Sequence, residues 1–350
     1  MVSGRSVRSG PSDLGMVRDS RGGEIAVRVI RTLRALGVTD VAFDGLAGLP
    51  RLLGYVAIVL ALTAAALPAG EVSIPEPPVI GAKSYFLVDA NSGFELAAFQ
   101  PDEPLAPASL TKLMSAYTIF KALDDGEIGL EEEVTVSEKA WRMPGSRMFI
   151  EVGSRVSVRD LLLGMIVQSG NDASVALAEH VAGSEAIFAE VMNRYAESLG
   201  MDASHFVNVS GLSDENHYST ARDLATLARA IINEYPDYYD LYSVREYTWN
   251  DISQRNRNRL LWRDTSVDGM KTGHTDDAGY CLVSSAERDG MRVVSVVLGM
   301  ATPKSRTEGS QALLDYGFRF FETRLLFRAG EPVAEARIWK AEDEFTPLGL

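Results

Sequence analysis

The sequence predicts an α/β fold of the α+β kind, in which helices cover a mainly antiparallel sheet. Two strand-like runs flank a turn signal near residue 90, and three more lie between residues 269 and 298. Patterns of helical period fill the region between these two groups. Strands that follow one another along the chain through short turns usually pair antiparallel, so both groups favour the same kind of sheet.

The first two predicted strands are 84–89 and 94–99, joined by Asn91-Ser92-Gly93, which is a typical hairpin turn sequence. A helix is then predicted from about Ser109 to Leu123, because apolar residues recur there at helical spacing. Further helical patterns cover residues 160–167, 172–181, 185–199 and 220–233. The last of these opens with Thr220-Ala221-Arg222-Asp223, which has the spacing of a helix cap.

Ser109 and Lys112 are three residues apart at the start of a predicted helix, so their side chains share one face. A neutral lysine amine can remove the proton of a serine hydroxyl and activate it as a nucleophile. Burial or a neighbouring cation lowers a lysine pKa enough to keep the amine neutral. The unpaired N–H groups and positive dipole end of the helix also favour an anion beside Ser109. A solvated lysine after a capping serine is the alternative.

Two more short motifs follow. Ser169-Gly170-Asn171 separates two helical patterns, where an ordinary connecting turn is the alternative interpretation. Lys271-Thr272-Gly273 lies at the start of a strand-like segment. At a sheet edge, its lysine and threonine supply a cation and a donor for a carboxylate. Its glycine removes a side chain that would block an antiparallel peptide substrate.

The remaining strands are predicted at 269–272, 279–285 and 292–298, and the last two flank the turn Arg288-Asp289-Gly290. A closing helix runs from about 305 to 321, and residues 331–339 begin another strand-like segment. Between residues 235 and 262 the chain is polar and aromatic and contains Asn256-Arg257-Asn258-Arg259. Arginines in such a loop are usually solvated.

Composition describes a globular protein, with 46% hydrophobic residues and a formal charge of −14 over 350 residues. Residues 1–69 carry eight arginines and five acids, a net of +3, so the rest carries −14 − 3 = −17. A body this acidic argues against nucleic acid as a partner. Cys281 is the only cysteine and is predicted to be a buried thiol. The four histidines form no familiar ligand spacing, and we predict that no cofactor is needed.

The N-terminal region divides into three segments. Residues 1–51 form an extension that we expect to be disordered or cytoplasmic. Residues 52–69 are an unbroken apolar run after Arg51, which fits a secretory signal peptide or an uncleaved membrane anchor. A buried core helix is a further alternative, but the run is apolar on every face. Residues 70–78 are a Pro-rich spacer. Both favoured interpretations place the following residues outside the cytoplasm.

The three motifs each occur once, in the order Ser109-Leu110-Thr111-Lys112, Ser169-Gly170-Asn171 and Lys271-Thr272-Gly273-His274. This order resembles that of the low-molecular-mass penicillin-binding proteins that act as D-alanyl-D-alanine carboxypeptidases. Residues 258–262 and 317–323 strengthen the resemblance, which extends from about residue 79 to 321. It implies a β-lactamase/transpeptidase-like fold, with the site between the sheet edge and an all-helical lobe.

The resemblance also implies roles for individual residues. Ser109 would be the acylated nucleophile and Lys112 its base. Ser169 and Asn171 would shuttle a proton and hold the peptide. Lys271 and Thr272, beside Gly273, would contact the substrate's terminal part. The backbone N–H groups of Ser109 and His274 would bind the oxyanion. Arg306 would bind the terminal carboxylate, and Arg257 would be a second substrate contact.

By this resemblance, the chain removes the terminal D-alanine from peptidoglycan pentapeptides and is inhibited by β-lactam antibiotics. It would act on the periplasmic side of the bacterial inner membrane, secreted or anchored there through residues 52–69. Residues 79–328 would be the catalytic domain and 329–350 the start of a truncated β-rich domain. The alternatives are a DD-endopeptidase acting on crosslinks, a class A-like β-lactamase, and a non-catalytic cell-wall-binding protein. No glutamate motif for β-lactamase deacylation is found.

Overall fold

The structure is a computed structural model that describes residues 17–18, 24–31, 74–328, 330–337 and 345–349. Its contacts separate Arg31–Glu76 from a unit made of Met1–Ile30 and Pro77–Leu350, and the five-stranded sheet, the helical lobe and the site described below lie within Pro77–Leu350. The apolar segment 52–69 and most of the extension and spacer predicted around it lie outside the described residues. Among the described helices, none is both long and apolar enough to cross a bilayer.

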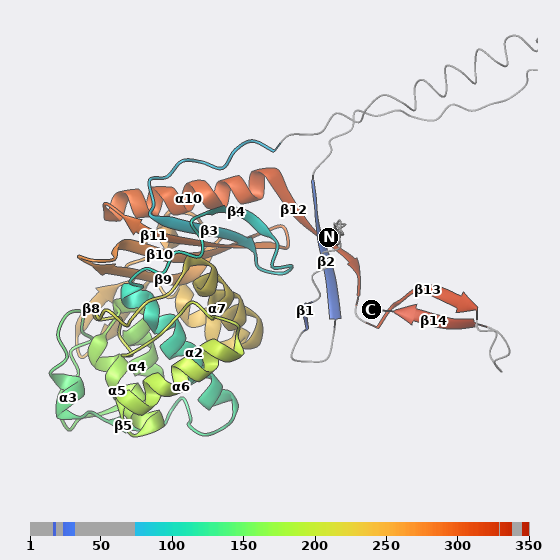
Figure 1. The fold of residues 1–350 in the computed structure, drawn as a ribbon. Coiled ribbons are helices and arrows are strands. Elements are labelled where there is room, and N and C mark those ends of the chain that lie inside the picture. Colours follow the sequence, from blue (N-terminus) through green and yellow to red (C-terminus); the bar gives the residue numbers. More distant parts are fainter. Residues whose placement is uncertain (1–16, 19–23, 32–73, 329, 338–344, 350) are drawn as a thin grey trace, which may run out of the picture. The chain divides into compact units, whose positions relative to one another are not determined.

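A five-stranded sheet forms the centre of the fold, in the order β4-β3-β11-β10-β9 (Figure 1). Its strands are β3 (Ser84–Asp89), β4 (Glu95–Phe99), β9 (Val267–Thr275), β10 (Gly279–Arg288) and β11 (Met291–Met300). All neighbouring pairs are antiparallel. The two predicted groups of strands, far apart in the sequence, meet where β3 pairs with β11. This confirms the predicted mainly antiparallel sheet.

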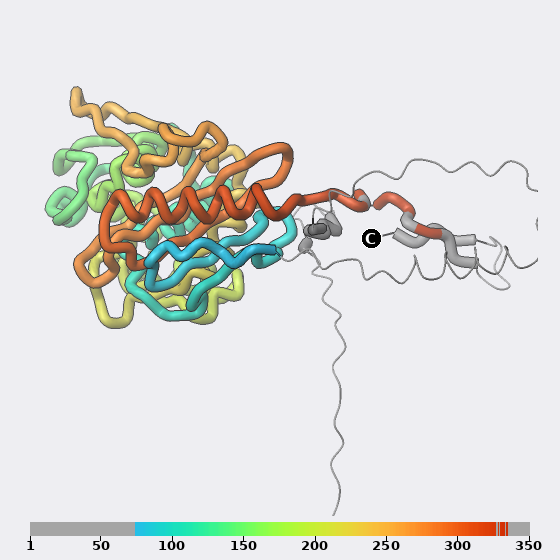
Figure 2. Tube along the Cα trace, turned by 90° about the horizontal axis from the view of Figure 1, so that it is seen from above, coloured from blue at the N-terminus to red at the C-terminus, as the bar shows by residue number. Residues whose placement is uncertain are grey.

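Helices cover both faces of this sheet. Helix α10 (Pro303–Phe320) contacts β10 and β11 on one face, and α7 (Ala221–Glu234) contacts β3 and β11 on the other (Figure 1). Seen from above, α10 lies in front of the rest of the domain (Figure 2). Because both faces are covered, β11 is apolar without strict alternation, and it is buried along nearly its whole length.

An all-helical lobe lies beside the sheet and is organised around α2 (Thr111–Asp124). The other helices of the lobe are α3 (Glu138–Trp141), α4 (Val158–Leu163), α5 (Asn171–Ala182) and α6 (Glu185–Ser198). Helix α2 contacts α5, α6 and α7, so it is buried on almost every side, including its polar residues. Ser115, for example, is fully buried and donates a hydrogen bond to the carbonyl oxygen of Val209 at 2.8 Å.

Shorter elements complete the described structure. They are the turns η1 (Ala108–Leu110), η2 (Gly164–Gln168) and η3 (Asp240–Ser243), the helices α8 (Pro236–Tyr239) and α9 (Leu260–Arg263), and the strand β12 (Phe321–Phe327). The paired strands are β5 (Glu133–Thr135) with β6 (Arg155–Ser157), β7 (Glu246–Trp249) with β8 (Ile252–Arg255), β13 (Pro332–Arg337) with β14 (Phe345–Gly349), and β1 (Val17–Arg18) with β2 (Glu24–Arg31).

Most predicted elements are present, with differences at their ends. The helix expected from Ser109 begins as the 3-10 turn η1 before it becomes α2. The pattern at 160–167 is not one helix, because α4 passes into the wider turn η2 after Leu163. The predicted cap is confirmed, since Thr220 Oγ1 accepts from the Asp223 N–H at 3.1 Å. The hairpin β7-β8 was not predicted, because its short, largely exposed strands carry no apolar run.

The prediction for the single cysteine is also confirmed. Cys281 lies on β10 with no exposed surface, and its thiol forms no disulfide. Burial raises the pKa of this thiol to about 11, so it stays protonated near neutral pH. A buried, protonated thiol is unreactive, and Cys281 therefore serves as a core residue.

Candidate active site

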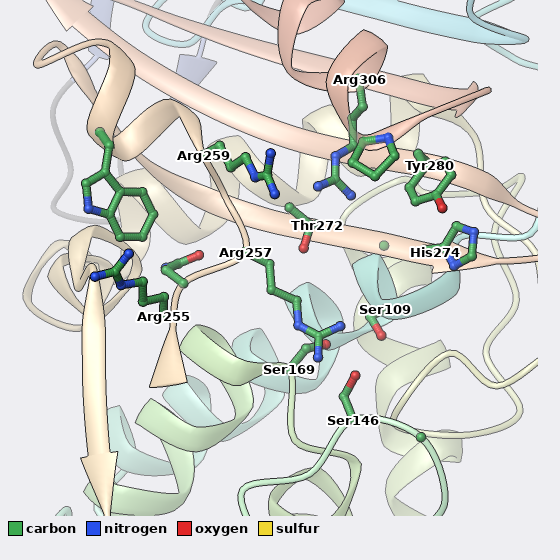
Figure 3. A pocket seen from close by; sticks show the side chains of 15 residues that line it. Ser109, Ser146, Ser169, Arg255, Arg257, Arg259, Thr272, His274, Tyr280 and Arg306 are labelled. Carbon is green, nitrogen blue, oxygen red and sulfur yellow. The ribbon is translucent and has the colours of Figure 1, made fainter. Parts of the chain in front are cut away.

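A cavity of about 920 Å³ lies between the edge strand β9, the helical lobe and the segment after β8 (Figure 3). It is lined by Ser109, Gly145, Ser146, Ser169, Arg255, Asn256, Arg257, Arg259, Trp262, Thr272, Gly273, His274, Tyr280, Pro303 and Arg306. Seven of the ten residues predicted for the site are among them. The other three, Lys112, Asn171 and Lys271, are buried just behind the cavity wall, at 1%, 5% and 2% exposure.

The turn that carries Ser109 is held in an unusual conformation. Ala108 has a φ of 48°, in the left-handed region that residues with a side chain rarely adopt. A Cβ added to Gly211 would lie 1.8 Å from the Ala108 carbonyl oxygen, so only glycine fits there. A Cβ on Gly273 would meet the Pro107 oxygen at 2.9 Å. The missing side chain of Gly273 therefore lets β9 approach the serine turn, which differs from the predicted reason of clearing space for substrate.

Two buried polar side chains fix this turn from behind. Thr111 Oγ1 donates to the Ala108 carbonyl oxygen at 2.8 Å and lies 2.7 Å from His217 Nε2. The Val207 N–H donates to His217 Nδ1 at 3.1 Å, so the ring proton is on Nε2 and points at Thr111. Burial lowers the pKa of His217 to about 4, which keeps the ring neutral near pH 7. The chain His217–Thr111–Ala108 thus positions the residue before the serine.

Lys112 has three hydrogen-bond partners around its amine. Nζ lies 2.7 Å from Asn171 Oδ1, 2.7 Å from the Ser210 carbonyl oxygen and 3.2 Å from Ser109 Oγ. The two carbonyl-type oxygens can only accept, so each must receive an N–H from the lysine. A neutral amine has two N–H groups and one lone pair. When both N–H groups are used in this way, the lone pair points at the hydroxyl of Ser109.

The surroundings of Lys112 favour this neutral form. Burial and, to a smaller extent, the positive charge of Arg257 together lower its pKa to about 7, against a smaller opposing effect of Asp172. A large fraction of the lysine is therefore neutral at physiological pH. The predicted pairing of a serine hydroxyl with a neutral amine has the required geometry and charge state.

Ser169 and Asn171 approach from the helical lobe. Ser169 ends η2 with a φ of 68°, and its hydroxyl is buried with no hydrogen-bond partner among the described residues. Asn171 donates through Nδ2 to the Pro144 carbonyl oxygen at 2.7 Å while its Oδ1 accepts from Lys112. The amide of Asn171 is therefore oriented by two fixed partners, whereas the hydroxyl of Ser169 is available for a ligand in the cavity.

Asp172 anchors the loop that closes this side of the cavity. Its carboxylate accepts from the backbone N–H groups of Met148, Phe149 and Ile150 at 2.9, 2.9 and 3.4 Å. It also accepts from the N–H of Ala173 at 2.9 Å. The loop segment just before these donors contributes Ser146 to the cavity lining. Asp172 thus links the start of α5 to a part of the wall that the sequence did not identify.

Strand β9 supplies the opposite wall. Lys271 Nζ donates to the Thr272 carbonyl oxygen at 3.1 Å, and Thr272 and His274 line the cavity. Burial and the charges of three nearby cations hold the pKa of Lys271 well below its usual range. The His274 ring stacks on Tyr280 with 4.0 Å between ring centroids.

Arg306 and Arg257 reach the same cavity from different elements. Arg306 lies on α10, is 7% exposed and has a buried Nε with no hydrogen-bond partner among the described residues. Its guanidinium lies 5.9 Å from the centre of the Tyr280 ring. Arg257 follows β8 and reaches toward Ser169 (Figure 3). The sequence did not predict a place in the site for Arg255, Arg259, Trp262 or Tyr280, although its run of alternating arginines is visible as a pattern.

The site contains no evident metal centre. Within the described part of the chain, no group of three or more histidine, cysteine, aspartate or glutamate side chains could hold a metal ion. The cavity lining carries four arginines and no acidic residue. Its chemistry is therefore that of a nucleophile with a nitrogen base in a cationic pocket suited to an anionic substrate.

The sequence matches one protein family model, described as D-alanyl-D-alanine carboxypeptidase (Peptidase_S11), over residues 71–302. The chain is 46% identical over 278 residues to D-alanyl-D-alanine carboxypeptidase DacA of Haemophilus influenzae, which covers 78% of this chain and 71% of that protein. It is 40% identical to DacF of Bacillus subtilis over 272 residues, which cover 76% of this chain and 70% of that protein.

Solved structures give the same relation. Penicillin-binding protein 5 from Haemophilus influenzae matches with a TM-score of 0.77 and 45% identity, covering 79% of this chain and 81% of that chain. Penicillin-binding protein D2 from Listeria monocytogenes, in its ampicillin-bound form, matches with a TM-score of 0.64 and 32% identity. That match covers 70% of this chain and 100% of that chain.

Replacing Thr111 with valine tests the support behind the serine turn. The substitution keeps the side-chain shape but leaves the Ala108 oxygen and His217 Nε2 unpaired and buried. We expect a loss of about 1–3 kcal/mol in the free energy of unfolding, measured by urea denaturation. Thr118→Val is the matched control, because Thr118 is buried in the same helix but its hydroxyl bonds only the Met114 carbonyl oxygen at 3.0 Å. Equal losses in the two variants would contradict a special role for Thr111.

Proposed function

The chain belongs to the D-alanyl-D-alanine carboxypeptidase family, and we propose that it is a serine-type peptidase that removes the terminal D-alanine from peptidoglycan pentapeptides. The observation that carries this proposal is the placement of Ser109 Oγ 3.2 Å from the amine of Lys112, beside a cationic cavity. The names of the relatives support the choice of substrate.

The first half of the proposed reaction forms an acyl-enzyme. Ser109 Oγ attacks the carbonyl carbon between the two D-alanines while neutral Lys112 takes the hydroxyl proton. The N–H groups of Ser109 and His274 stabilise the oxyanion, an effect worth about 3–4 kcal/mol per donor elsewhere. The C–N bond then breaks, and Ser169 passes the proton to the departing amine. D-alanine leaves, and the shortened peptide stays bound to Ser109 as an ester.

Water completes the cycle by attacking the ester, and Ser109 regains its proton. Throughout, the amide of Asn171 holds both the lysine and the peptide. Lys271 and Thr272 bind the substrate's terminal part, and Gly273 keeps this strand close to the serine. Arg306 binds the terminal carboxylate, and Arg257 is a second contact with the peptide. β-Lactams would acylate the same serine, and the ampicillin-bound form of the Listeria relative supports this.

Residues 52–69 are proposed to carry the catalytic domain across the cytoplasmic membrane, as a cleaved signal or as an anchor. Their unbroken apolar composition supports this, together with the location of peptidoglycan outside the cytoplasm.

The reaction and its nucleophile are tested together with Ser109→Ala. The purified full-length protein is incubated with a peptide ending in D-Ala-D-Ala, and free D-alanine is measured. We expect release by the wild type and none above background by the variant, since Ser109 supplies the one hydroxyl among the described residues that is hydrogen-bonded to the Lys112 amine. The variant should also fail to form a covalent adduct with a fluorescent penicillin. Ser243→Ala, at an exposed site on η3, is the control for substitution as such. D-alanine release that persists in Ser109→Ala would exclude Ser109 as the nucleophile.

The role of Lys112 predicts a pH dependence. Because the amine must be neutral, the acylation rate should rise as pH increases through about 7 and level off above it. Arg257→Gln removes a positive charge that lowers the pKa of Lys112, so the midpoint should move to higher pH. Acylation by a penicillin between about pH 5 and pH 9 measures this. Arg263→Gln, outside the cavity lining, should leave the midpoint in place. An unmoved midpoint in Arg257→Gln would refute the proposed coupling.

The membrane proposal is tested by cell fractionation in a bacterial host. We expect the full chain outside the cytoplasm and a chain lacking residues 52–69 inside it. Mass spectrometry of the recovered protein then separates a cleaved signal, with a new N-terminus near residue 69, from an intact anchor. Recovery of the full chain from the soluble cytoplasm would contradict both forms of the proposal.

A further inference from the structure

From Arg255 at the end of β8, the chain alternates arginine and asparagine, with the arginine side chains exposed and the asparagine side chains buried. Asn256 is buried and donates through Nδ2 to the Val244 carbonyl oxygen at 3.0 Å. Asn258 is buried and donates to the Gly269 carbonyl oxygen at 2.8 Å. The exposed side chains of Arg255, Arg257 and Arg259 line the cavity (Figure 3). The buried asparagines thus fix the direction of the arginines.

These arginines differ in their partners. Arg255 forms an ion pair with Glu246, with Nε and Oε2 3.1 Å apart. Arg257 and Arg259 form no ion pair or side-chain hydrogen bond with any described residue. A guanidinium carries five N–H donors, and a pocket that leaves them unused is prepared for an acceptor from outside the chain.

Arg259 and Arg306 approach one another from opposite sides of the cavity. Their guanidinium groups point toward one another beside Thr272 in the close view (Figure 3). Burial is the main reason that the pKa of Arg306 is lowered to about 10, and the positive charge of Arg259 contributes to this lowering more than that of Arg257 does. Arg306 also presents its buried, unpartnered Nε at this point. Two cations that repel each other are stabilised when an anion enters between them.

We propose that Arg259 is a substrate-binding residue that, together with Arg306 and Thr272, holds the terminal carboxylate of the peptide. A carboxylate can accept from two guanidinium groups and a hydroxyl at once, because it offers about four lone-pair sites. The inference rests on the proposed function, since the ligand is the carboxylate of the departing residue. It adds to that function a second arginine that selects peptides with a free C-terminus.

Binding without turnover is the direct test. In the Ser109→Ala background, calorimetry measures the affinity of full-length protein for an N-acetylated peptide ending in D-Ala-D-Ala, and for the same peptide with a C-terminal amide. Arg259→Ala should weaken binding of the free acid about tenfold or more and leave binding of the amide nearly unchanged. Arg259→Lys, which keeps the charge but loses the forked donors, should fall between these two affinities.

The matched control is Arg263→Ala, which removes the same charge four residues away on α9, outside the cavity lining. It should leave both affinities unchanged. Folding of Arg259→Ala is checked by thermal unfolding. Arg259 occupies the N-cap position of α9 but makes no side-chain capping bond. The variant with Arg259→Ala should therefore be as stable as the Ser109→Ala protein.

The outcomes separate this inference from the proposed function. If the wild type releases D-alanine but Arg259→Ala does not change binding of the free acid, the inference is overturned and the proposed function is retained. If the wild type releases no D-alanine but binding of the free acid depends on Arg259, the proposed function is overturned and the inference is supported. Equal weakening of the acid and the amide, or no binding of either peptide to the Ser109→Ala protein, overturns the carboxylate contact.

Discussion

A lysine amine withdrawn from water is the constraint on which the site depends. Lys112 keeps two N–H groups on fixed carbonyl-type oxygens, one from Asn171 and one from Ser210. These acceptors come from two segments of the chain that are far from α2 in the sequence. The amine is oriented toward Ser109 only when the helical lobe and the Ser210 loop are both in place. Folding of the lobe and assembly of the base are therefore one event.

The charges around that amine explain the unusual electrostatics of the cavity. The chain carries a formal charge of −14, yet no carboxylate lines the cavity. The positive charge of Arg257 acts on both Lys112 and Lys271, and that of Arg306 acts on Lys271. Burial is the larger cause of the low lysine pKa values, and this repulsion adds to it and so helps to prepare a base. It also leaves a net positive potential that an anionic peptide can neutralise. A single arrangement thus serves both activation of the serine and attraction of the substrate.

Parts of the site that depend on local spacing could be predicted from the sequence, and parts that depend on distant backbone could not. The helical offset between Ser109 and Lys112 and the strand around Thr272 follow from periodicity. The contribution of Ser210 comes from a main-chain carbonyl, which no side-chain pattern reveals. Likewise, His217 supports the serine turn from a loop over one hundred residues away. The orientation of Arg259 depends on a short hairpin whose polar sequence resembles that of an ordinary loop.

The alternation of Arg255, Asn256, Arg257, Asn258 and Arg259 has a consequence for how this segment can vary. Its side chains have a repeat of two, in which the asparagines are buried and bonded to backbone carbonyl oxygens and the arginines are exposed in the cavity. A gain or loss of one residue would exchange the two sets and place guanidinium groups where amides now bond to carbonyl oxygens. A gain or loss of two residues would leave each of the two residue types on its present side. The length of this segment is therefore constrained in steps of two, whereas the identity of each cavity-facing residue is free to change by substitution.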